Sequence, residues 1–106
     1  MKTKVHLAWC LSPLLLIGSG ASLASSLDSA VLANTCAACH GTHGNSPGAI
    51  PNIARLPANV IQQAMVSFRD GSRASTVMGR IAMDYSDDQI LKIANYLAEV
   101  NQHVSQ

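Results

Sequence analysis

Apolar residues recur at three- and four-residue steps in three stretches of the chain, a spacing typical of helices with one buried face. The first predicted helix runs from about Leu27 to Cys39. The second begins near Pro57, because a helix tolerates the missing N–H of proline in its first turn, and Gly71 ends it. The periodic positions are Leu27, Ala30, Val31 and Asn34 in the first helix, and Val60, Ile61, Ala64, Met65 and Phe68 in the second.

The third predicted helix opens with a capping box formed by Ser86 and Gln89, and the two aspartates between them suit the positive end of the helix dipole. The inward-facing positions of this third helix are Ile90, Ile93, Ala94 and Leu97.

The stretches between these helices hold glycine and proline and read as loops, above all residues 41–56, which contain Pro47 and Pro51. No alternating or β-branched run predicts a strand after residue 26. The pattern therefore predicts one small all-α domain.

The N-terminus has a different pattern, with Lys2 and Lys4 followed by an apolar stretch at residues 7–17 and small residues up to Ser26. Such an order is typical of an export signal. The apolar stretch is shorter than the roughly 20 residues that a membrane-spanning helix needs. We therefore expect a cleaved signal and no membrane span in the mature protein.

The small residues Ser22 and Ala24 favour cleavage after Ala24, with Ala21 as the competing site. The predicted organisation is a signal peptide at residues 1–24 and one domain at residues 25–106. This predicts a periplasmic protein.

Composition limits what the mature domain can do. Residues 25–106 hold five Lys and Arg against six Asp and Glu, a net charge of −1, which does not indicate nucleic-acid binding. The aromatic residues are few for so short a domain, and something else must fill its centre. They are Phe68, Tyr85 and Tyr96.

The sequence Cys36-Ala37-Ala38-Cys39-His40 has the spacing at which c-type haem is attached. In a helical turn, three residues rotate the chain by about 300°, so Cys36 and Cys39 lie side by side and can reach both vinyl groups of one porphyrin. His40 then points its imidazole at the iron.

Three other readings use the same residues: a disulfide, a thioredoxin-like redox pair, and half of a zinc site completed by His40 and His43. The redox pair lacks a βαβ context, and the zinc site lacks a second ligand pair. A disulfide suits an exported protein but gives no reason for the adjacent histidine. We therefore favour haem attachment, and expect His43 and His103 to be solvated.

A haem used for electron transfer takes a second axial ligand, and methionine opposite histidine raises its reduction potential. Met65 falls on the apolar face of the second helix and is expected in the core. Met78 follows the irregular segment 71–76, and Met83 lies five residues further on. Spacing alone leaves Met78 and Met83 both open.

From Asn34 to Val100 the chain resembles class I cytochrome c, in the short bacterial monohaem form, and is most similar to the haem subunits of flavocytochrome c sulfide dehydrogenase. The resemblance rests on residues 36–41 (CAACHG), 50–54 (IPNIA), 68–73 (FRDGSR), and 76–82 (TVMGRIA) followed by 85–87 (YSD).

This resemblance implies three main helices and loops around one covalently attached haem c with its iron. It implies Met78 as the second ligand, because in such proteins the methionine lies eight residues before the Ser-Asp helix start. It also implies that the carbonyl of Pro51 accepts a hydrogen bond from His40, and that Tyr96 lies against the first helix.

The function implied is electron transfer without catalysis on a substrate. The partner is a redox protein, with a sulfide-oxidising flavoprotein as the leading candidate, and a freely diffusing electron shuttle is the alternative. The chain could dock through residues 42–48 with Ala37 and Ala38, which lack Lys and Arg. Four arginines are candidates for the haem propionates: Arg55, Arg69, Arg73 and Arg80.

Overall fold

The computed structural model describes residues 20–104, which form five α-helices and one short 3₁₀ helix. No strand occurs in this part of the chain, so the predicted all-α class is confirmed. The elements are α1 (Gly20–Asn34), α2 (Ala37–His40), η1 (Thr42–Gly44), α3 (Ala58–Arg69), α4 (Met78–Ala82) and α5 (Asp87–Val104).

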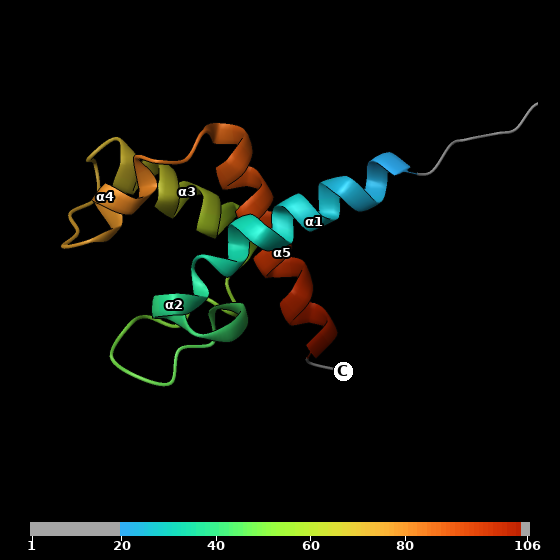
Figure 1. The fold of residues 1–106 in the computed structure, drawn as a ribbon. Helices are drawn as coiled ribbons and strands as arrows, with labels where there is room; N and C mark the ends of the chain where they lie inside the picture. The colour runs from blue at the N-terminus through green and yellow to red at the C-terminus, as the bar shows by residue number, and fades with distance from the viewer. Residues whose placement is uncertain (1–19, 105–106) are drawn as a thin grey trace, which may run out of the picture.

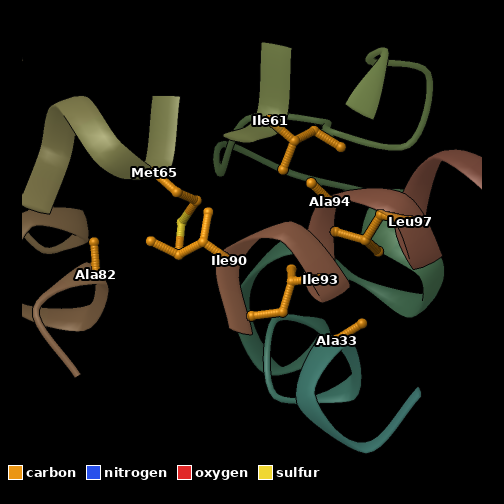
Figure 2. Close-up of a cluster of buried hydrophobic side chains, with 8 residues drawn as sticks. All are labelled: Ala33, Ile61, Met65, Ala82, Ile90, Ile93, Ala94 and Leu97. Atoms are coloured by element: carbon orange, nitrogen blue, oxygen red, sulfur yellow. The ribbon is translucent and has the colours of Figure 1, made fainter. Parts of the chain in front are cut away.

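Helix α5 is the central element, and its predicted inward stripe is confirmed. Ile90, Ile93 and Leu97 are each at most 2% exposed and are the largest fully buried side chains. Figure 2 shows these side chains between Ile61 and Met65 of α3 on one side and Ala33 of α1 on the other. The core is therefore a layer of apolar side chains on both sides of one helix.

The C-terminal part of α1 crosses α5, and α3 packs against α5 beside this crossing (Figure 1). Figure 1 shows α2 with the loop that follows it on the same side of the crossing as α3 and α4. Helix α4 packs closely on α3, and α2 packs on α1 and η1. The segment with the cysteines and the segment with Met78 thus lie on the same side of the packed helices α1, α3 and α5.

The first helix differs from its prediction at both ends. It begins earlier, at Gly20, and ends at Asn34 instead of continuing to Cys39. The hydroxyl of Thr35 donates a hydrogen bond to the carbonyl of Leu32, at 2.7 Å, and competes with the helical ladder there. A separate short helix, α2, then carries the cysteine motif.

The buried face of α1 also differs from the prediction. Leu27 and Val31 are 67% and 69% exposed, whereas Ala33 is buried in the core. A small side chain at Ala33 allows the backbones of α1 and α5 to approach closely. Tyr96 lines the same surface depression as Ala30 and Val31, so its predicted place against the first helix is confirmed.

Helix α3 begins one residue later than predicted, with Pro57 as its N-cap, and Gly71 follows its end with φ +79°. Ile61 and Met65 are buried as predicted, but Val60 is 39% exposed. Val60 lies about 100° around the helix from Ile61, which already faces α5.

The start of α5 is fixed by the predicted capping box. The Ser86 N–H donates to Oε1 of Gln89 at 2.9 Å, and the Gln89 N–H donates to Oγ of Ser86 at 3.3 Å. Arg69 of α3 adds an ion pair with Asp87 and a hydrogen bond from Nη1 to the carbonyl of Tyr85 at 3.1 Å. The C-terminal end of α3 is therefore tied to the first turn of α5.

Most of the predicted export signal, residues 1–24, lies outside the described residues. Because α1 begins at Gly20, the predicted boundary after Ala24 falls inside this helix. Among residues 20–104, no helix combines the length and the apolar character needed to cross a membrane.

Ile93→Ala should lower the free energy of unfolding of the haem-loaded protein by about 2–5 kcal/mol, because it leaves a cavity at the centre of the core. Leu91→Ala is the matched control, since Leu91 lies on the same helix but is 42% exposed, and it should change stability by less than about 1 kcal/mol. Guanidinium titration followed by circular dichroism measures both, and equal effects would contradict the assignment of the core.

Candidate functional site

The cysteine motif lies in a single helical turn. The Cys36 carbonyl accepts a hydrogen bond from the His40 N–H at 2.9 Å, and the Ala37 carbonyl accepts one from the Gly41 N–H at 3.0 Å. Since Cys36 and Cys39 are three residues apart on this turn, their side chains project from neighbouring positions of one face. Cys36 is half-buried and Cys39 is exposed.

The structure does not support the other readings of this motif. Both thiols are free, so Cys36 and Cys39 do not form a disulfide. Residues 20–104 contain no group of three or more His, Cys, Asp or Glu side chains placed to hold a metal ion, so the zinc reading finds no support. The redox-pair reading needs strands, and the described residues contain none.

Burial raises the pKa of the Cys36 thiol, and the neighbouring Thr35 side chain and the backbone oppose this effect in part. This matches its packing beside the apolar core.

The imidazole of His40 is oriented by the loop that follows it. Its Nδ1 lies 2.7 Å from the carbonyl oxygen of Pro51, which is the contact that the family resemblance implied. A carbonyl oxygen can only accept a hydrogen bond, so Nδ1 carries the proton. Nε2 is then the nitrogen with a free lone pair, and it is the atom available to a metal ion.

Pro51 is held in place by hydrogen bonds that fold residues 52–54 back onto residues 44–45. Asn52 donates from Nδ2 to Oδ1 of Asn45 at 2.8 Å, and its own Oδ1 accepts from the Ala54 N–H at 2.9 Å. The Ile53 N–H donates to the carbonyl of Gly44 at 2.9 Å. Sequence reasoning noted the segment 50–54 but missed the amide side chains that fix it.

Two glycines permit this fold. Gly41 has φ +78°, and a Cβ there would lie 2.3 Å from the carbonyl oxygen of Asn45. Gly44 has φ +77°, and a Cβ there would lie 2.6 Å from Cγ1 of Ile53. No other residue type fits either position without moving the loop that carries Pro51.

His43 is half-buried in η1 with φ +53°, so its prediction as a solvated loop residue is wrong. The cause is Asn101 of α5, whose Nδ2 donates to the carbonyl of His43 at 2.9 Å and to that of Leu97 at 2.7 Å. This contact holds η1 against the end of α5. His103 is exposed, as predicted.

The three methionines of the described chain lie in different environments. Met65 is 6% exposed and belongs to the core, which confirms its prediction. Met83 is 63% exposed. Met78 is the first residue of α4 and is half-buried against the core cluster.

Large apolar side chains remain exposed on the segments that extend to the same side of the α1–α5 crossing (Figure 1). Each of them is between 36% and 54% exposed. A flat apolar ligand such as a porphyrin would cover such side chains. They are Ile50 and Leu56 in the loop, Val60 in α3, and Val77 and Ile81 around α4.

The four arginines considered for the propionates are not equivalent. Arg69 is engaged by Asp87 and by the Tyr85 carbonyl. The guanidinium of Arg73 lies 4.6 Å from the centroid of the Phe68 ring. Arg55 and Arg80 are exposed.

An all-α fold that presents a Cys-x-x-Cys-His turn, a histidine with a free Nε2 and uncovered apolar side chains has the features of a c-type cytochrome. The sequence pattern of one family, cytochrome c, matches residues 29–101, and the chain belongs to this family. It therefore carries covalently attached haem c with its iron, the redox cofactor of this family.

Several bacterial proteins are similar in sequence. The cytochrome subunit of sulfide dehydrogenase of Chlorobaculum tepidum is 43% identical over 72 residues, which cover 68% of this chain and 66% of the relative. The thiosulfate dehydrogenase electron acceptor of Stutzerimonas stutzeri is 37% identical, over 63% of this chain and 33% of the relative. Cytochrome c-554(548) of Halomonas halodenitrificans is 36% identical, over 58% of this chain and 80% of the relative.

Gly41→Ala should destabilise the haem-loaded protein by more than about 1 kcal/mol, because an alanine at this positive φ is strained and its Cβ meets backbone. It should also lower the fraction of protein recovered with haem, measured as the ratio of haem to polypeptide. Gly48→Ala is the control, since a Cβ at Gly48 has no atom within 4 Å. If both variants behaved alike, Gly41 would have no part in shaping the loop.

Proposed function

We propose that residues 25–106 form an exported, single-haem electron-transfer protein with His40 and Met78 as axial ligands. We further propose that it serves as the haem subunit that accepts electrons from a sulfide-oxidising flavoprotein. The observation that carries the ligation is the 2.7 Å contact between His40 Nδ1 and the Pro51 carbonyl, which leaves Nε2 for iron. The 43% identity to a sulfide dehydrogenase cytochrome subunit supports the partner.

The residues of this chain have separate tasks in the proposed site. Cys36 and Cys39 form the thioether bonds, and His40 binds iron through Nε2. The Pro51 carbonyl accepts the hydrogen bond from Nδ1–H, which makes His40 a stronger electron donor to the metal. When bound, haem c supplies a one-electron redox couple.

Met78 is proposed as the second axial ligand. Its half-buried position against the core contrasts with the exposure of Met83, which favours Met78 as a ligand held by the fold. With both axial positions taken by the chain, no position stays open for an external ligand, and the activity is outer-sphere electron transfer.

The redox partner is proposed to dock on residues 42–48 together with Ala37 and Ala38, next to the cysteines that attach the haem. Between Asp28 and Arg55 the sequence has no Asp, Glu, Lys or Arg. A partner that approaches Ala38 and Thr42 therefore meets polar and apolar groups without formal charge. Association at such a surface depends on shape and apolar contact more than on long-range steering.

A free periplasmic shuttle is the second candidate. It is favoured by the similarity to a thiosulfate dehydrogenase electron acceptor, whose name describes a protein that receives electrons from a dehydrogenase. Export to the periplasm fits both candidates and rests on the predicted signal at residues 1–24.

Met78→Ala should abolish the sulfur-to-iron absorption band of the oxidised protein near the red edge of the visible spectrum, because the thioether ligand is lost. It should also lower the reduction potential, since methionine favours the reduced iron. Met83→Ala is the matched control and should keep the band. A band that survives Met78→Ala would exclude this residue as the ligand.

Purification of the tagged protein from periplasm separates the two candidates for partner. The subunit function predicts co-elution with a flavin-containing polypeptide in equal amount. This complex should change little between ionic strengths of about 0.01 M and 0.15 M, because the proposed docking surface carries no charged side chain. Elution as a free monomer would instead support the shuttle.

A further inference from the structure

The segments that carry the two proposed axial ligands have no direct helix contact. Helix α2, with His40, has its close neighbours on α1 and η1, whereas α4, with Met78, has its close neighbours on α3. The separation between these two ligands is therefore set through other parts of the protein. A contact that joins the two segments directly would therefore help to fix the distance between His40 and Met78.

One side-chain hydrogen bond joins them. The hydroxyl of Tyr85 lies 2.9 Å from Oγ1 of Thr35, across 50 residues of sequence. Thr35 directly precedes Cys36, and Tyr85 follows α4 by three residues.

The direction of this hydrogen bond follows from the second contact of Thr35. Its Oγ1 lies 2.7 Å from the carbonyl oxygen of Leu32, which can only accept. The single hydroxyl proton of Thr35 is therefore committed to Leu32. Tyr85 must then be the donor and Thr35 Oγ1 the acceptor.

Tyr85 is also held firmly on the side of α4. Its N–H donates to the carbonyl of Ala82 at 3.3 Å, and its carbonyl accepts from Nη1 of Arg69 at 3.1 Å. The ring is half-buried and packs against the core cluster. A shift of Tyr85 would therefore move the end of α4 with it.

We propose that the hydrogen bond from Tyr85 to Thr35 fixes the Met78 segment relative to the His40 segment, which makes Tyr85 a positioning residue for the sulfur ligand. This inference rests on the proposed ligation by Met78. Tyr85 would then strengthen the bond between Met78 and iron without touching either ligand. Its hydroxyl bonds to Thr35 and contacts neither Met78 nor the imidazole of His40.

The test uses Tyr85→Phe in the mature, haem-loaded protein, which keeps the ring and removes only the hydroxyl. Carbon monoxide competes with the methionine for reduced iron, so its apparent affinity reports how easily this ligand leaves. We expect the apparent affinity to rise about three- to tenfold, the range that corresponds to one lost hydrogen bond. The sulfur-to-iron band of the oxidised resting protein should persist.

Thr35→Val removes the acceptor while keeping the shape of the side chain, and should raise the affinity for carbon monoxide by a similar factor. Thr35→Val also removes the hydrogen bond to Leu32, so the double variant should match Thr35→Val, in which Tyr85 has already lost its acceptor. Additive effects in the double variant would overturn the inference.

Tyr96→Phe is the matched control, since Tyr96 is also a half-buried tyrosine packed on the same core. Its hydroxyl makes no hydrogen bond within residues 20–104. This variant should bind carbon monoxide like the wild type. A rise as large as that of Tyr85→Phe would show general loosening and would overturn the inference.

Met78→Ala in the same assay separates this inference from the ligation on which it rests. If Met78→Ala keeps the sulfur-to-iron band, the proposed ligation fails. If Met78→Ala loses the band and binds carbon monoxide strongly while Tyr85→Phe behaves like the wild type, the ligation stands and the positioning role of Tyr85 is excluded.

Discussion

The burial of apolar side chains of α5 fixes the positions of the other helices of this small domain relative to one another. Ile90 and Ile93 are at most 1% exposed, and the layer they form separates α1 from α3. Helix α4 packs on α3, and α2 packs on α1 and η1. Because α1 and α3 lie on different sides of α5, loss of this packing would separate the segment with His40 from the segment with Met78.

The loop after the cysteine motif orients His40 through hydrogen bonds. Positive φ angles at Gly41 and Gly44 turn the chain, and Asn45 and Asn52 close it by a side-chain hydrogen bond. The carbonyl of Pro51 then selects the Nδ1 proton of His40. The imidazole is thereby held in one orientation, with Nε2 turned away from this hydrogen bond.

Charges are distributed unevenly along the chain. The sequence has no formally charged side chain between Asp28 and Arg55, whereas Arg69, Arg73 and Arg80 follow one another from the end of α3, through the connecting segment, to α4. Arg69 has a structural task in tying α3 to α5. The segment around Cys39 therefore lacks formal charge, and three of the basic groups lie before and after Met78 in the sequence.

The sequence by itself determined the features that depend on near neighbours in the chain: the all-α class, the capping box at Ser86, the stripe of α5 and the spacing of the cysteine motif. Each follows from local periodicity or from the chemistry of a few adjacent residues. The tertiary structure decided the end of α1 at Asn34, the exposure of Val31, and the clamps at Asn101 and Tyr85. Local periodicity does not predict these features. Each depends on which residue, distant in the sequence, becomes a neighbour when α1 and α3 pack against α5.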